Sequence, residues 1–213
     1  MDVMRFFDES ARARVTEAVW RAEATSRGQI VPAVVEKSDP YPEARFRGAL
    51  LGAALGTAAV LLLDLPLSLA ELPLVQAAAG LAGALAAMWD PLERRLVGAR
   101  AMNQAVRSRA LRAFHEHGLQ RTAEGTGVLV FASLFERRAV VLGDHGIHAR
   151  MGDAGWEEAV QALLAGLRRG QPGQGFEEAI ARCGARLDEH FPRQAGAAAP
   201  VNELGDVLQV SRS

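Results

Sequence analysis

Two apolar blocks in the first half of the chain constrain its fold more than any other feature. The first runs from Gly48 to Pro66 with a single charge, Asp64, and the second runs from Leu72 to Trp89 with none. Each approaches the roughly 20 residues that a helix needs to cross a hydrocarbon core of about 30 Å. The pattern predicts a transmembrane helical hairpin over residues 48–89. Two alternatives stay open: buried core helices of a soluble domain, and a hairpin at the membrane interface.

Small residues recur at four-residue spacing in both blocks. The first block carries the row Gly48, Gly52 and Gly56, and the second carries a similar row around Gly83. Such rows let two membrane helices approach closely, so that dispersion forces hold them together. We favour packing within one hairpin because both rows are present in the same chain. Association between chains, giving a homo-oligomer, is the alternative.

Basic residues flank the two blocks and are missing from the loop between them. The flanking arginines nearest the blocks are Arg45, Arg47, Arg94, Arg95 and Arg100. The positive-inside rule then predicts a protein of the inner (cytoplasmic) membrane with two spans and a cytoplasmic soluble domain. These arginines either contact anionic lipid headgroups or only set the topology.

The rest of the sequence predicts an α/β domain divided by the hairpin, with residues 1–47 and 90–192 as its two parts. Strands are expected at "QIVPAVVEKS", "GTGVLVFASLFE" and "RRAVVLGD", with helices before, between and after them. Pro32 is awkward in a central strand, which favours an edge position or a bulge. Residues 193–213 are expected to form a flexible tail, with at most a short docking segment at Glu203–Val210.

Charge and cysteine content narrow the classes of partner. The chain has 24 basic and 25 acidic residues, so it has no overall basic field, and we expect no nucleic-acid partner. The one cysteine, Cys183, has no second cysteine with which to form an intramolecular disulfide. Its apolar neighbours predict a buried role as a small hydrophobic side chain.

Three segments together resemble the TPM domain family of thylakoid and bacterial membrane-associated proteins. They are "SRGQIVPAVVEKS", "TGVLVFASLFERRAVVLGDHGI" and "WEEAVQALLAGLRRGQPGQGFEEAIARCGARL". The resemblance rests on their order and spacing. It implies a three-layer α/β/α domain with a small central sheet, here interrupted by the hairpin. It also implies one of the family's roles: weak acid-phosphatase activity, calcium binding, or assembly and repair of membrane complexes.

The resemblance further implies an acidic site for calcium or magnesium near the strand ends. Glu136 and Asp144 are the matching acids in this chain, but Gly125 and Thr126 replace part of the usual acidic turn. A hard cation needs several oxygen ligands, and we expect Glu136 and Asp144 to lie at opposite ends of a strand. Capping of a turn is the alternative role for Asp144.

The sequence therefore favours a non-enzymatic function at the lipid bilayer. We expect a membrane-anchored TPM-like domain that binds a membrane or cytoplasmic protein and helps to assemble or maintain a membrane complex. A weak metal-dependent phosphatase and a homo-oligomeric membrane scaffold are the alternatives.

Overall fold

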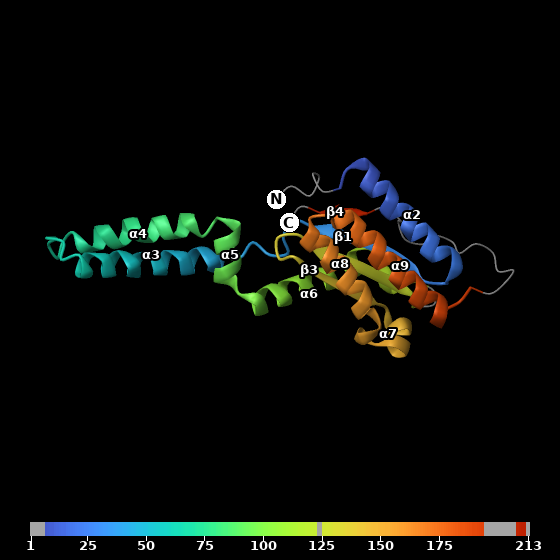
Figure 1. Ribbon diagram of the computed structural model, residues 1–213. Coiled ribbons are helices and arrows are strands. Elements are labelled where there is room, and N and C mark those ends of the chain that lie inside the picture. The colour runs from blue at the N-terminus through green and yellow to red at the C-terminus, as the bar shows by residue number, and fades with distance from the viewer. Residues whose placement is uncertain (1–6, 123–124, 194–207, 212–213) are drawn as a thin grey trace. The chain divides into compact units, whose positions relative to one another are not determined.

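The computed structural model describes residues 7–122, 125–193 and 208–211 (Figure 1). The chain forms two compact units. One, which we call the α/β unit, consists of residues 1–39 and 104–213. The other, the hairpin unit, consists of residues 40–103, so that one unit is inserted into the other. The second boundary falls inside helix α6, Ala99–Glu116.

A four-stranded mixed sheet forms the centre of the α/β unit. Its strands are β1 (Gln29–Val35), β2 (Gly127–Ser133), β3 (Arg138–Gly143) and β4 (Gln209–Ser211), in the order β3-β2-β1-β4. Strand β1 pairs in parallel with both β2 and β4, whereas β2 and β3 form an antiparallel hairpin. The predicted α/β class with a small central sheet is confirmed.

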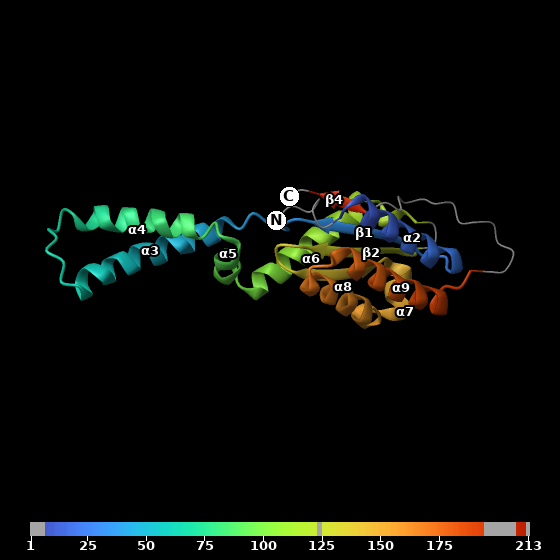
Figure 2. The same ribbon diagram turned by 45° about the horizontal axis from the view of Figure 1, so that its top comes forward.

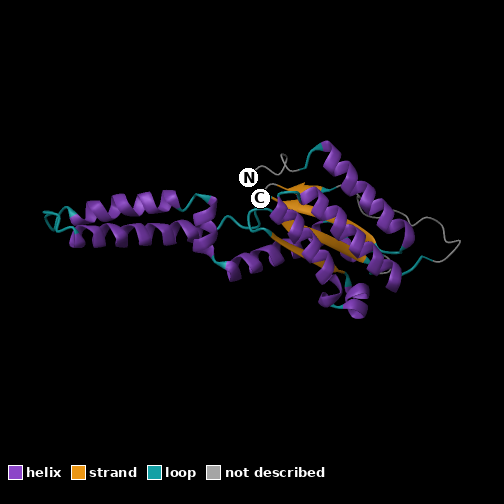
Figure 3. Ribbon diagram, in the orientation of Figure 1, coloured by secondary structure: helices purple, strands orange, loops and turns teal. Residues whose placement is uncertain are grey.

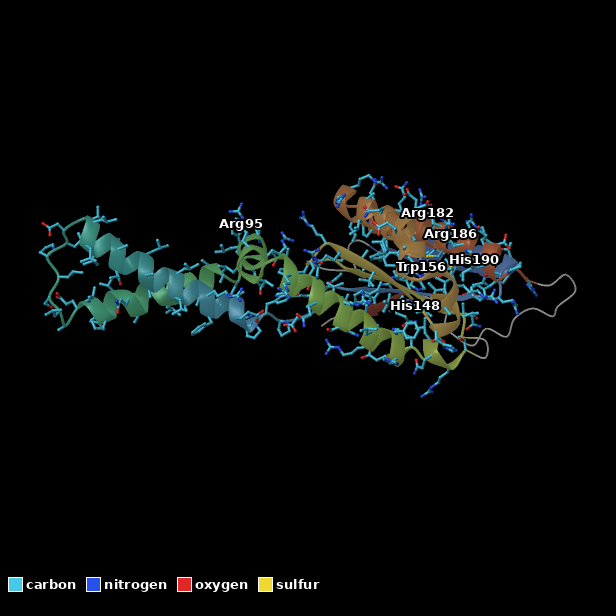
Figure 4. The ribbon with its side chains drawn as sticks, turned by 90° about the horizontal axis from the view of Figure 1, so that it is seen from below. Arg95, His148, Trp156, Arg182, Arg186 and His190 are labelled. Atoms are coloured by element: carbon cyan, nitrogen blue, oxygen red, sulfur yellow. The ribbon has the colours of Figure 1, made fainter. Side chains whose placement is uncertain are left out.

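Helices cover both faces of this sheet. Helices α2 (Glu9–Thr25), α8 (Glu157–Arg169) and α9 (Pro172–His190) pack on one face, and α6 packs on the other (Figures 3 and 4). Side chains of a strand alternate between faces, so Ile30 and Val34 join the first core and Val31 and Val35 join the second. Every residue of β1 and β2 is buried, which explains their unbroken apolar runs.

Strand β1 lies inside the sheet, but at Pro32 no described residue pairs with the side of the strand that faces away from β2. The Gln29 N–H donates to Thr126 on the β2 side, whereas the Ile30 N–H points away and donates to Glu23 Oε1 at 2.7 Å. By alternation, the nitrogen of Pro32 also faces away from β2. Strand β4 pairs only with residues 33–35 of β1, so no ladder bond is lost at Pro32. The edge-like environment that we expected for Pro32 is therefore present, but only at the start of β1.

Part of the expected tail is a strand. Leu208 is buried in the core, and Gln209–Ser211 form β4 against β1. The remaining tail residues, 194–207 and 212–213, lie outside the described part of the chain. Pairing of so short a strand depends on a partner far away in the sequence, which local patterns do not reveal.

The hairpin unit contains three complete helices and the first residues of α6. Helices α3 (Pro42–Leu62) and α4 (Leu72–Ala86) lie side by side, and the short α5 (Asp90–Val97) crosses the end of α4 (Figures 1 and 2). By length and composition α3 is able to cross a membrane. Helix α4, with 15 residues, is long and apolar enough to cross a membrane only together with α5, from which it is bent by 101°. The described residues thus contain one candidate span, or two if the bent pair counts as one.

Glycines set the distance between α3 and α4. A Cβ atom on Gly48 would come within 2.5 Å of the Gly83 carbonyl oxygen, and one on Gly52 would overlap the Ala79 carbonyl oxygen. Only glycine allows the two backbones to approach so closely. One polar bond joins the helices, from Gln76 Nε2 to Thr57 Oγ1 at 2.9 Å. The structure therefore places the two small-residue rows against each other within one chain.

The lone cysteine is fully buried in the core, as expected. Cys183 of α9 packs on the sheet, and its burial raises the pKa of the thiol to about 12 because the thiolate is poorly solvated there. A protonated, inaccessible thiol is a poor nucleophile. Labelling of Cys183 therefore reports unfolding of the α/β unit.

We expect the native protein to resist thiol reagents and to lose stability above pH 9. The unfolded thiol releases its proton near pH 9.0 while the folded one keeps it to about 12, so the unfolded state is favoured as pH rises. The loss should approach about 1.4 kcal/mol per pH unit. Urea unfolding at several pH values measures it. The Cys183→Ala variant should show a shallower decline, and an equal decline would contradict the assignment.

Candidate functional site

The carboxyl ends of the parallel strands β1 and β2 form one candidate site. In open α/β sheets, ligands bind outside the carboxyl ends of parallel strands. At this edge, Ser38 follows β1, Ser133 ends β2, and Glu136 lies in the turn to β3. The Leu134 and Phe135 N–H groups donate to the carbonyls of Val35 and Glu36, which holds the turn against the end of β1.

Hydrogen bonds close this edge of the sheet. The Ser38 hydroxyl donates to Ser133 Oγ at 2.9 Å, and the Ser133 hydroxyl donates to Glu136 Oε2. The other carboxylate oxygen, Oε1, accepts from the Ser38 N–H at 2.9 Å. All three residues are buried. Glu136 thus joins the ends of β1 and β2, and both of its oxygens already accept hydrogen bonds.

Asp144 lies at the opposite end of β3. Its Oδ1 caps helix α7 (His145–Met151) by accepting from the His145 N–H at 2.7 Å, and its own N–H donates to the Gly127 carbonyl at 2.8 Å. The carboxylate is mostly buried, and its Oδ2 has no hydrogen-bond partner among the described residues. Asp144 therefore takes the capping role that its position after a strand suggests.

The structure does not bring Glu136 and Asp144 together. All six residues of β3 separate them, which at about 3.3 Å per residue is roughly 20 Å. One cation therefore cannot be held by both. Nor do residues 7–122, 125–193 and 208–211 contain any group of three acidic, histidine or cysteine side chains suited to a metal ion. Calcium or magnesium binding by this pair has no geometric basis in the described chain.

Two shallow grooves lie on the outer face of the helical layer. One, of about 460 Å³, runs between α2 and α9, and its floor is made of small residues. They are Ala18, Ala22, Ala181, Gly184 and Ala185. The helices approach closely here, since a Cβ on Gly184 would come within 2.6 Å of the Ala22 side chain.

The second groove, of about 610 Å³, lies between α8 and α9 and shares Ala181 and Ala185 with the first. Charged side chains form its rim, and Figure 4 shows Arg182 and Arg186 along α9. Both pair with Glu158, at 3.4 and 3.9 Å. Exposed pairs of this kind contribute little to stability, so they are free to exchange partners. This surface was not among the sites predicted from the sequence. Alanines spaced four residues apart on α2 and on α9 were the sequence pattern that could have indicated it.

The arginines that flank the hairpin have different environments. Arg47 of α3 donates to the carbonyl oxygens of Leu96 and Val97, at the end of α5. It therefore caps a helix, a role that the sequence did not predict. Arg45, Arg95 and Arg100 are exposed, and Arg94 is half-buried.

A comparison with protein families matches part of the chain. The model of the TPM domain family matches residues 95–186, which contain α6, β2, β3, α7 and α8 and most of α9. A TPM domain is therefore recognised in this part of the chain, which confirms the resemblance there. The strand β1 and the helices α3 and α4 lie outside the matched region.

A solved structure has a similar fold. It is the NMR structure of the BA42 protein from the psychrophilic bacterium Bizionia argentinensis, with a TM-score of 0.61 over 99% of both chains. The two sequences are 16% identical, so the likeness is one of fold alone. No curated protein matches the chain.

The hydrogen bond from the buried Ser133 hydroxyl to Glu136 predicts a structural role for Ser133. We expect Ser133→Ala to lower the free energy of unfolding by about 1–3 kcal/mol, because it leaves a buried carboxylate short of a donor. Urea unfolding followed by circular dichroism measures the loss. The exposed Ser108 of α6 provides the control, and Ser108→Ala should change stability little. Equal stability of the two variants would show that the bond to Glu136 contributes nothing.

Proposed function

We propose that this protein is a membrane-anchored TPM-like domain that binds another protein and so helps to assemble or maintain a membrane complex. One observation carries the anchor: no described residue covers the apolar outer surface of the hairpin unit. Only 6% of the apolar window of α3 is buried. This argues against the core helices of a soluble domain, which would be mostly buried.

Large side chains make up this outer surface. The exposed ones on α3, α4 and the loop between them are Phe46, Leu50, Leu51, Leu55, Leu61, Leu62, Leu63, Leu65, Leu67, Leu69, Leu74, Leu81 and Leu85. An apolar patch of this size on a water-soluble protein would promote aggregation. Facing lipid, the same side chains are stable. The small residues face inward, so the unit is apolar on the side that a bilayer would contact.

The dimensions of the hairpin unit support two spans. The 21 residues of α3 extend for about 31 Å, close to the hydrocarbon thickness of about 30 Å. The 15 residues of α4 extend for about 22 Å. Leucines of the connecting loop, such as Leu67 and Leu69, lengthen the apolar surface beyond the end of α4. The arginines at the base, together with a tip whose only charged residues are acids, support a cytoplasmic position for the base.

The outer face of the helical layer supports the binding of a partner protein. Its grooves have small, apolar floors between charged rims, the shape that receives an amphipathic helix. A helical segment of a membrane or cytoplasmic protein is the partner that we propose. We prefer this function to a phosphatase because the two candidate acids lie at opposite ends of β3. We prefer it to a homo-oligomeric scaffold because the glycine row already contacts Gly83 and Ala79 in the same chain.

A charge on the outer face of α3 should weaken anchoring. Leu55 is 69% exposed in the middle of this helix, where an aspartate would face hydrocarbon. We expect Leu55→Asp to release a large fraction of the protein from membranes washed at alkaline pH, whereas the wild type stays in the pellet. Leu111→Asp, at an exposed leucine of α6, is the matched control and should stay bound. Release of the wild type would refute the anchor.

A bulky residue in the grooves should prevent partner binding. Ala185 belongs to both grooves, so we expect Ala185→Trp to abolish a stoichiometric partner that co-purifies with the wild type in mild detergent. Ala154→Trp, at an exposed alanine away from the grooves, should keep that partner. Mass spectrometry identifies and quantifies the partner. Equal recovery with both variants would place the binding surface elsewhere.

A further inference from the structure

We propose that α5 lies in the headgroup layer of the membrane and, with the exposed arginines around it, forms a binding surface for anionic lipids. This inference rests on the membrane anchoring proposed above and specifies which lipids the anchor selects. It concerns the hairpin unit alone.

The direction of α5 is the first observation. The chain turns by 101° between α4 and α5, so α5 runs nearly at right angles to the hairpin axis (Figure 1). If α4 follows the membrane normal, α5 lies close to the membrane plane. Pro91 at the start of α5 prevents α4 from continuing as a straight helix. The backbone at the base of the hairpin therefore sets the direction of α5 relative to α4.

A cap from α3 holds α5 in this direction. The Arg47 guanidinium reaches the carbonyl oxygens of Leu96 and Val97, the last residues of α5. A cation at this end also complements the helix dipole. The residues at the two ends of α5 are thus tied to the hairpin: Trp89 by the chain itself and Val97 by Arg47. Because both ends of α5 are held in this way, the depth of α3 in the membrane sets the depth of α5.

Aromatic and sulfur-containing side chains mark the interface at the same level. Trp89, the residue before α5, is 68% exposed, and its neighbour Met88 is also exposed. Tryptophan is enriched where hydrocarbon meets headgroups, because its ring is apolar and its N–H is polar. Trp89 therefore places the start of α5 at the boundary of the hydrocarbon core.

Charges at the base complement an anionic surface. Arg45, Arg95 and Arg100 are exposed, and Figure 4 shows Arg95 projecting outward from α5. Three acids lie at the same end: Glu93 is buried, and Glu43 and Asp90 are half-buried, so the arginines are the more exposed charges there. Asp64 and Glu71, the two acids of the tip, lie at the other end of the hairpin. The base is thus the end of the unit suited to phosphate-bearing headgroups.

Spin-labelled lipids test this inference with the full-length protein. The chain is reconstituted in phosphatidylcholine vesicles, and electron paramagnetic resonance measures the association of spin-labelled phosphatidylglycerol relative to phosphatidylcholine. We expect a several-fold preference for phosphatidylglycerol, lowered roughly twofold by Arg95→Gln and nearly abolished by Arg45→Gln/Arg95→Gln. Arg182→Gln, which removes the same charge from α9, should keep the wild-type preference. High salt should weaken the preference.

The outcomes separate this inference from the proposed anchor. Alkaline-resistant incorporation into the vesicles reports the hairpin, and lipid preference reports the base. The headgroup surface is refuted if the protein incorporates but shows no lipid preference, or if Arg182→Gln lowers the preference as much as Arg95→Gln does. Either result leaves the proposed anchor intact. A protein that fails to incorporate overturns the anchor and, with it, this inference.

Discussion

The parallel pairing of β1 with β2 is the constraint on which the rest of the structure depends. Parallel neighbours cannot be joined by a tight turn, so the chain must leave one end of the sheet and return to the other. The connection from Val35 to Gly127 contains the whole hairpin unit and α6. Because α6 covers its face of the sheet, the hairpin is added to the crossover without disturbing any described strand.

The hairpin unit satisfies its own polar and packing needs. Glycine and alanine bring the backbones of α3 and α4 together, Gln76 bonds to Thr57, and Arg47 caps α5. The large leucines of its outer layer stay exposed. In the anchor that we propose, small residues on the inner face would hold the two helices together by dispersion, and the leucines on the outer face would contact lipid.

The strand ends of the α/β unit are closed, and its grooves lie on the helical layer. Ser38, Ser133 and Glu136 close the strand ends where many α/β proteins hold a ligand, and Asp144 is used as a helix cap. The outer face of α2, α8 and α9 keeps alanine-floored grooves with exchangeable charges. A surface of this kind suits a macromolecular partner better than a small substrate.

The sequence by itself determined the elements and the class. The apolar runs of β1 and β2, the two apolar blocks and the glycine row are local patterns, and local physics is enough to interpret them. Only the tertiary structure decided what depends on distant contacts: that β4 joins β1 (Val34 opposite Val210), that Glu136 and Asp144 lie a full strand apart, and that Arg47 caps α5 instead of facing outward. Pairing of short strands, side-chain capping and separation across a sheet are set by long-range geometry, which no window of sequence contains.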